Sequence, residues 1–140
     1  MMTISLEAKT LELKFTWKIA RNASDFKRNF FIRICDGDFE AMGEAAPNVR
    51  YGESAELITV QFEQLQNAGL SQIQDVETLH SLFQKISTCN SLRFGIESAF
   101  INFWSRNEVE KYLAISKAKE ISTAFTMPIM PIGEMCEFYK

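Results

Sequence analysis

Glycine and proline are scarce in this chain, which has six Gly and three Pro among 140 residues. With 46% apolar and 24% charged side chains, the composition is typical of one soluble globular domain. Long hydrophobic runs are absent too. None approaches the roughly 20 residues of a membrane span, and Met1–Lys18 alternates charged and apolar residues where a signal peptide has an apolar core. We therefore expect a cytoplasmic protein without a membrane partner.

An excess of basic charge is also missing. Fifteen Lys and Arg side chains stand against eighteen Asp and Glu, so the net charge is -3 and the isoelectric point is near 5.2. A protein that binds nucleic acid or an anionic membrane needs a concentrated positive surface. The charge balance therefore predicts no nucleic-acid partner.

Cysteine is too sparse to form a framework. Cys35, Cys89 and Cys136 are odd in number, far apart and without a C-x-x-C pair. This spacing indicates neither a set of disulfides nor a thiolate metal site. We expect all three to be buried thiols.

Residues for independent catalysis are few. His80 is the only histidine, and its place beside an apolar position of a predicted helix favours a half-buried structural role. No G-x-S-x-G elbow and no Gly-rich phosphate loop occurs. Glu97 lies in the most apolar segment, where a buried carboxylate needs a partner, and Arg93 four residues earlier is the expected one. The sequence thus offers no catalytic residue of its own.

A length of 140 residues excludes a complete (β/α)8 barrel, which needs roughly 250. Residues 3–17 alternate apolar and polar side chains, which indicates a strand with one solvated face. The apolar segments 30–35 and 39–42 flank Asp36-Gly37-Asp38, a sequence that suits a tight hairpin turn. We predict a three-stranded antiparallel meander, with the polar segment Lys18–Asn29 as a long surface loop.

After Gly52 the apolar pattern takes the period of a helix. The first helix is expected to end before Gly69, which suits a left-handed residue just past a helix. Asp75 is placed to cap a second helix, and Asn90 or Ser91 to cap a third. The apolar stripes of the first two helices are Ala55, Ile58, Phe62 and Leu65, then Val76, Leu79, Phe83 and Ile86.

The third helix is the most apolar and is expected to be buried between the sheet and its neighbours. Gly95 and Ala99 lie four residues apart in it, either as a site of close backbone approach or as a chance pair. A short helix over 108–116, a strand over 121–127 and a helix starting near 131 complete the pattern. The predicted fold class is α+β, with a meander, three or four helices and one isolated final strand.

Four stretches resemble the N-terminal capping domain of the enolase superfamily, in its muconate-lactonizing branch. The likeness is greatest to dipeptide epimerases of the L-Ala-D/L-Glu type, which are isomerases of the muconate cycloisomerase group. The stretches occur in the order and spacing of that family, and cover essentially the whole chain but about a third of a typical member. They are IARNASDFK (19–27), GEAAPNVRYGE (43–53), LRFGIESA (92–99) and TAFTMPI (123–129).

The resemblance implies an enolase-like capping domain over 1–118 and the start of a truncated (β/α) barrel over 119–140. In that family two loops of the capping domain close over the barrel mouth and select the substrate. The matching loops here are 20–28 and 45–53. An Arg fork in such a loop suits a substrate carboxylate in two-point geometry, whereas the alternative is a solvated surface arginine or one bound to a backbone carbonyl. The implied substrate-binding residues are Arg21, Phe26, Arg50 and Tyr51, with ordinary packing as the alternative for the two aromatics.

The chemistry of the family lies in the barrel, where lysines abstract an α-proton and three acidic residues hold magnesium. This chain stops before those motifs, and Lys117-x-Lys119 precedes the first barrel strand, so we take these as surface lysines. We expect no cofactor in this chain, Mg²⁺ in a full-length relative, a dipeptide-like substrate only in that context, and a catalytically inert domain.

A second interpretation is a stand-alone binding or assembly module. Residues 121–140 carry apolar side chains whose barrel partners are absent, which predicts a homo-oligomer or a barrel-bearing partner bound through this tail. A third is an unrelated α+β fold that shares the motifs by chance.

Overall fold

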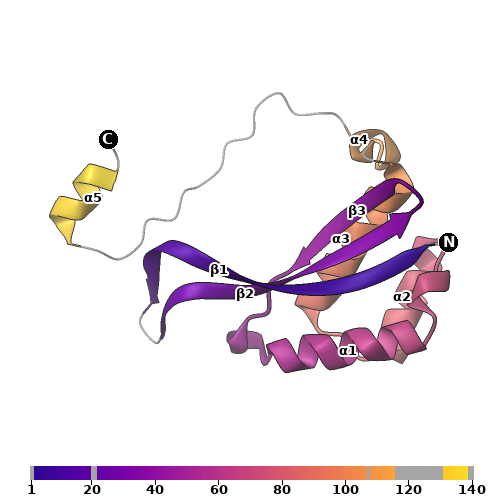
Figure 1. Ribbon diagram of the computed structural model, residues 1–140, viewed down its shortest axis with the longest axis horizontal. Coiled ribbons are helices and arrows are strands. Elements are labelled where there is room, and N and C mark those ends of the chain that lie inside the picture. Colours follow the sequence, from indigo (N-terminus) through magenta and orange to yellow (C-terminus); the bar gives the residue numbers. More distant parts are fainter. Residues whose placement is uncertain (1, 20–21, 107, 116–130, 139–140) are drawn as a thin grey trace. The chain divides into compact units, whose positions relative to one another are not determined.

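The computed structural model describes residues 2–19, 22–106, 108–115 and 131–138. These residues form two compact units. We call the first, Met1–Lys9 with Arg28–Ser116, the core unit, and we call Thr10–Lys27 in the second the hairpin arm. The elements in chain order are β1 (Thr3–Ile19), β2 (Asn22–Asp36), β3 (Phe39–Ala45), η1 (Val49–Tyr51), α1 (Ala55–Asn67), η2 (Leu70–Gln72), α2 (Val76–Lys85), α3 (Asn90–Ser105), α4 (Val109–Tyr112) and α5 (Ile132–Phe138) (Figure 1).

The predicted meander is confirmed. The strands lie in the order β1-β2-β3, and β2 pairs antiparallel with β3 from Phe30 opposite Ala45 to Asp36 opposite Phe39. Gly37 and Asp38 form the turn between them, and Gly37 adopts φ +61°. A residue without Cβ adopts this left-handed conformation at no steric cost, which is why an Asp-Gly sequence predicts the hairpin.

The predicted loop Lys18–Asn29 is wrong. β1 continues to Ile19, and β2 begins at Asn22, so most of that segment is strand. Polar composition misled the prediction because side chains on both faces of this ribbon are largely exposed, and a solvated strand accommodates Ser, Asp and Lys as readily as a loop does. The Thr16 hydroxyl donates a hydrogen bond to the Asp25 carboxylate across the ribbon.

Two of the three predictions of helix ends are confirmed. The Ser54 hydroxyl caps α1, and Gly69, just past its end, has φ +97° as expected. The Asp75 carboxylate caps α2, with 2.7 Å between its Oδ1 and the backbone nitrogen of Thr78. The predicted cap of α3 is wrong, because Cys89 is the capping residue and its side chain makes no capping hydrogen bond.

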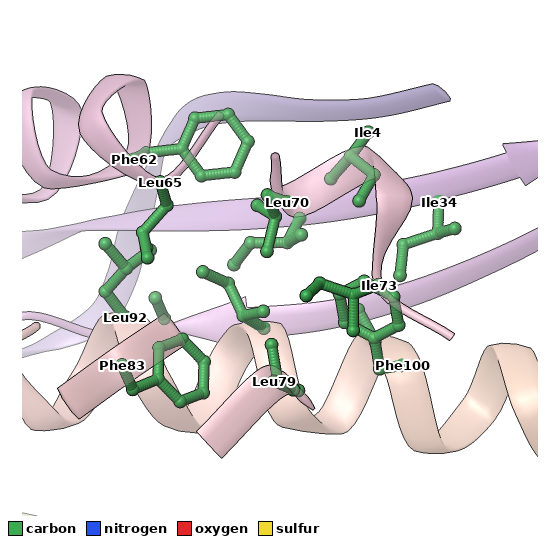
Figure 2. Packing of buried hydrophobic residues seen from close by; sticks show 14 of the residues in the cluster. Ile4, Ile34, Phe62, Leu65, Leu70, Ile73, Leu79, Phe83, Leu92 and Phe100 are labelled. Carbon is green, nitrogen blue, oxygen red and sulfur yellow. The ribbon is translucent and has the colours of Figure 1, made fainter. Parts of the chain in front are cut away.

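The hydrophobic core lies between one face of the sheet and helices α1 to α3 (Figure 2). The sheet contributes alternate residues, as expected for strands with one buried face. Ile32, Leu65 and Phe100, from β2, α1 and α3, are all fully buried. The other members are Ile4, Phe30, Ile34, Ala45, Ile58, Phe62, Leu70, Ile73, Leu79, Leu82, Phe83, Leu92, Ile96 and Ala99.

Backbone contact joins α3 to β3. A Cβ atom added to Gly43 would lie 2.0 Å from the carbonyl oxygen of Gly95 and 2.7 Å from the amide nitrogen of Ala99. The small pair Gly95 and Ala99 therefore marks a close approach, not a chance coincidence. The Asn102 side chain also donates to the Met42 carbonyl oxygen at 2.9 Å. β3 and the middle of α3 are thus in backbone contact, which leaves no room for a methyl group at Gly43.

The C-terminal predictions are tested only in part. The short helix expected over 108–116 is confirmed as α4, and the helix start near Pro131 as α5. The strand predicted over 121–127 lies outside the described residues. Among the residues that the structure describes, no helix is both long and apolar enough to cross a bilayer.

Candidate functional site

The structure places two of the four candidate substrate-binding residues in one turn. Arg50 and Tyr51 belong to η1, and 71% of Tyr51 is exposed. Phe26 lies in β2 within the hairpin arm, with 56% of its surface exposed, so it stands on a strand and not in the expected loop. Arg21 lies outside the described residues.

The turn that carries Arg50 is closed by its own backbone and by Asn48. The Asn48 side-chain oxygen accepts a hydrogen bond from the Arg50 amide at 3.0 Å, and the Asn48 carbonyl oxygen accepts one from the Tyr51 amide at 2.9 Å. Gly52 ends the turn with φ +72°, a conformation that costs glycine little. The side chains of Arg50 and Tyr51 project from a locally defined backbone.

Glu53 anchors this turn to α3. Only 6% of Glu53 is exposed, and its two carboxylate oxygens accept from different segments: Oε2 from the Asn48 amide and Oε1 from the Ser91 amide, both at 3.0 Å. The Ser91 amide is one of the first N–H groups of α3, which lack partners within the helix. Glu53 therefore does the capping that sequence analysis assigned to Asn90 or Ser91.

The ionisation of Glu53 follows from these contacts. Burial raises the pKa of its carboxyl group, but hydrogen bonds from the backbone of Ser91 and Asn48 stabilise the carboxylate. The result is a pKa below the ordinary value of 4.5. The role of Glu53 is not apparent from the sequence, because its partner Ser91 is 38 residues away and no local pattern indicates that contact.

An open concavity of about 530 Å³ lies beside residues 48–53, which we call the anchored turn. Two exposed aromatic rings line it, Tyr51 from η1 and Phe94 from α3. Phe94 is 66% exposed, against the expectation that nearly every side of this helix is buried. Glu44 adds a carboxylate that accepts from the Asn29 side chain at 2.6 Å. The remaining lining residues are Ala46, Asn48, Glu53, Asn90 and Ser91.

A second charged cluster has a structural arrangement. Glu97 Oε1 lies 3.0 Å from Arg93 Nε and 3.0 Å from His80 Nε2. The predicted pair of Arg93 and Glu97 is confirmed. His80 joins it from α2, with 44% of its side chain exposed. This cluster links two helices at the surface and supports the structural role expected for His80.

The described residues do not fit a magnesium site of the kind that the family resemblance implies. Nowhere in the described parts of the chain do three or more His, Cys, Asp or Glu residues lie close enough to hold a metal ion. Lys117 and Lys119 lie outside those parts. The three cysteines are free; Cys35 and Cys89 are half-buried, but Cys136 is exposed, so the expectation that all three are buried is wrong.

The chain is similar to known proteins in structure, although no similarity was found at the level of family models or curated sequences. The dipeptide epimerase from Methylococcus capsulatus, solved with Mg and the dipeptide L-Arg-D-Lys, superposes with a TM-score of 0.80 at 18% identity. The dipeptide epimerase from Cytophaga hutchinsonii, solved with Mg and D-Ala-L-Val, gives 0.80 at 20% identity.

This chain has the fold of one part of a dipeptide epimerase. It is covered over 98% by the Methylococcus enzyme and over 96% by the Cytophaga enzyme. An enolase family member from Agrobacterium tumefaciens, with homology to dipeptide epimerases, also matches, with a TM-score of 0.75 and 21% identity over 98% of this chain. The chain spans only about two fifths of the length of these three proteins, 41%, 39% and 41%. The predicted resemblance is confirmed at the level of fold.

Proposed function

We propose that this chain is the substrate-specificity capping domain of a Mg-dependent, dipeptide epimerase-like protein of the enolase superfamily. The observation that carries the proposal is the superposition with the Methylococcus dipeptide epimerase over 98% of this chain and 41% of that one. A domain that matches two fifths of an epimerase is expected to serve the same part of the reaction, the enclosure and selection of the substrate.

The anchored turn supports this role. Arg50 and Tyr51 stand exposed on a turn whose backbone is fixed by Asn48 and Glu53. A guanidinium group binds a carboxylate through two parallel hydrogen bonds, and every peptide substrate with a free C-terminus offers one. Tyr51 adds a rigid apolar ring at low cost in conformational entropy. A fixed backbone with an exposed Arg and Tyr is suited to selecting among dipeptides.

We propose that the hairpin arm contributes a second specificity element through Phe26 and Arg21. The exposed ring of Phe26 is available for an apolar substrate side chain. In this proposal Mg²⁺ and the proton-transferring lysines belong to the barrel of a full-length relative, and the domain alone is inert.

The inertness is tested by isotope exchange. The chain is incubated with Mg²⁺ and a panel of dipeptides in heavy water, and deuterium at the α-carbons is measured by NMR. We expect no exchange above that of a sample without protein. Solvent deuterium at any α-carbon would overturn the inert part of the proposal.

The specificity role is tested in a chimera in which this chain replaces the matching part of the Methylococcus epimerase. Arg50→Ala and Tyr51→Ala are expected to change the ratio of kcat/KM between dipeptides by about tenfold, because each removes a substrate contact. Lys111→Ala on α4, with 84% of its side chain exposed, is the matched control and should leave the ratio unchanged. Equal ratios in all three variants would contradict the proposal, provided that circular dichroism shows the chimera to be folded.

A second candidate function is assembly through the tail at residues 121–140, with another copy or with a barrel-bearing partner. One observation favours it: the side chain of Ile132, at the start of α5, is apolar and 79% exposed. Light scattering should then show a dimer that Ile132→Asp dissociates. A monomer at high micromolar concentration would count against it.

A further inference from the structure

The hairpin arm is a two-stranded ribbon. Among the described residues, each strand of the arm has a neighbouring strand on one side only. β3 pairs with β2 only along Phe30–Asp36, whereas β2 begins at Asn22. Over 22–29, β2 has β1 on one side and, in the described chain, no strand on the other. A two-stranded ribbon is marginally stable in water, and further strands or packing are needed to make it robust. The arm therefore gains stability from any strand that extends it.

β1 offers the longer open edge. It lies at the end of the sheet order and extends over 17 residues, Thr3–Ile19. Its outer backbone N–H and C=O groups have no partner strand among the described residues, which makes it a template for pairing with another chain. In the arm, its side chains alternate strictly: Leu11, Leu13, Phe15 and Trp17 on one face, and Glu12, Lys14, Thr16 and Lys18 on the other.

The apolar face of the arm is partly exposed. Leu11 and Phe15 each retain 37% of their surface, and Trp17 retains 36%. Large apolar residues gathered on one face of an open edge strand are typical of an interaction surface. The polar face carries an acidic residue, Glu12, two positions before a basic one, Lys14, so the charges reverse about Leu13.

We propose that β1 pairs antiparallel with β1 of a second copy of this chain, with the two-fold axis at Leu13. In this register Leu13 lies opposite its own copy, and Leu11 lies opposite Phe15 of the other chain. Glu12 lies opposite Lys14, twice by symmetry, and a symmetric interface is self-complementary in this way. Cross-strand pairs of opposite charge and of apolar residues both stabilise a sheet.

The neighbouring registers are worse on the same criteria. An axis at Glu12 sets two carboxylates opposite each other, and an axis at Lys14 sets two ammonium groups opposite each other. Like charges in directly opposed positions destabilise a sheet. An axis between residues moves every side chain to the other face, so that Leu13 stands opposite Glu12 or Lys14. The charge sequence thus selects the Leu13 register.

This dimer goes beyond the proposed capping function, in which the arm contributes Phe26 of β2, whereas the dimer pairs residues 11–15 of β1. The residues that pair, 11–15 of β1, do not include Arg50 or Tyr51, so the isotope and chimera experiments test capping whether or not the chain dimerises. The dimer also differs from assembly through residues 121–140, because it depends on Glu12 and Lys14 and not on Ile132.

Charge exchange tests the pairing. Mass is measured by light scattering over roughly 10 to 500 µM, a range suited to the small interface that strand pairing forms. Glu12→Lys and Lys14→Glu are each expected to weaken the dimer about tenfold, because each puts like charges opposite each other twice. The double variant Glu12→Lys with Lys14→Glu restores opposite charges and should recover the wild-type dissociation constant.

A cysteine at the symmetry axis tests the register. Leu13→Cys, treated with a mild thiol oxidant, is expected to yield a covalent dimer, because opposed residues lie within the Cα separation that a disulfide spans. Trp17→Cys, on the same face, is the matched control: its copies lie eight positions apart in this register and should not be linked. The unaltered chain reports any linkage through its native Cys35, Cys89 and Cys136.

Several outcomes overturn the proposal. A monomer throughout the concentration range does so, as does a dimer that is insensitive to both single charge variants. Linkage through Phe26→Cys in place of Leu13→Cys would assign the contact to the β2 edge instead. A dimer dissociated by Ile132→Asp alone would assign it to the C-terminal tail. Circular dichroism of each variant shows that a lost dimer is not a lost fold.

Discussion

The two segments that resemble specificity loops, 20–28 and 45–53, are built in different ways. In the first, residues 22–28 are strand, and the contact described across the ribbon is an exposed pair, Thr16 with Asp25. In the second, a short turn is held by Glu53, whose carboxylate is almost fully buried and is bonded to two backbone amides. Similar polarity in sequence thus corresponds to a solvated ribbon in one case and to an anchored turn in the other.

The difference indicates which of the two segments is the more rigid. An exposed hydrogen bond contributes little because water replaces it at almost no cost. A buried carboxylate leaves two amides unsatisfied when it is lost, so its removal disturbs both the turn and the first turn of α3. Substitutions in the two regions should therefore change the free energy of unfolding by different amounts. The following predictions test that contrast.

The largest effect is expected where the backbones of β3 and α3 meet. Gly43→Ala places a methyl group 2.0 Å from the Gly95 carbonyl oxygen, so the strand and helix must separate. We expect a loss of about 3 kcal/mol in the free energy of unfolding. Urea denaturation measures it. Gly133→Ala, in helix α5 where nothing lies within 4 Å, is the control and should lose no stability.

Removing the anchor should have the next largest effect. Glu53→Ala leaves the amides of Asn48 and Ser91 without their acceptor, and we expect a loss of about 2 kcal/mol. Hydrogen exchange should show faster opening at both amides. Glu44→Ala, a neighbouring exposed carboxylate, is the matched control; an equal loss in the two variants would mean that Glu53 is not an anchor.

The anchor should also make stability depend on pH. The pKa of Glu53 is lowered on folding, so its contribution is fully present above its ordinary value of 4.5 and is lost as the pH falls through the folded pKa. The pKa of Asp75, which accepts a hydrogen bond from Thr78, is also lowered and acts with the same sign. We expect the stability difference between the parent and Glu53→Gln to shrink between pH 5 and 3, as followed by thermal unfolding. A constant difference across that range would contradict the assignment.

The smallest effect is expected in the arm. Phe26→Ala removes a ring that is 56% exposed, and the free energy of unfolding should change by less than about 0.5 kcal/mol. Leu65→Ala in the core unit is the comparison, with an expected loss of about 3 kcal/mol because that side chain is fully buried. Chemical denaturation of both variants compares the two units directly. A loss of 2 kcal/mol at Phe26 would show that the arm is packed.

Local signals were sufficient for the predictions that proved correct. Gly37 in the hairpin, Gly69 after α1 and Asp75 before α2 each act on residues no more than a few positions away. The pair Arg93 and Glu97 lies within one turn of a helix. Such contacts are encoded by spacing alone, since the element that contains both residues brings them together.

The failures share one physical cause. Whether 22–28 is loop or strand depends on β1 as a partner, and polar residues suit both. The exposure of Phe94 depends on which side of α3 faces the sheet, and an almost wholly apolar helix does not specify its orientation. Both properties are decided by neighbours that are distant in sequence.

The amino-acid sequence by itself determined the helices, two helix ends, the hairpin turn between β2 and β3, and the order of strands and helices, because these depend on near neighbours and on apolar period. Only the tertiary structure decided that Glu53 holds the turn of Arg50 and Tyr51 against α3 and that, among the described residues, β1 has no partner strand on its outer side. A carboxylate finds its amide donors, and a strand its partner, through the packing of segments tens of residues apart, and no local pattern carries that information.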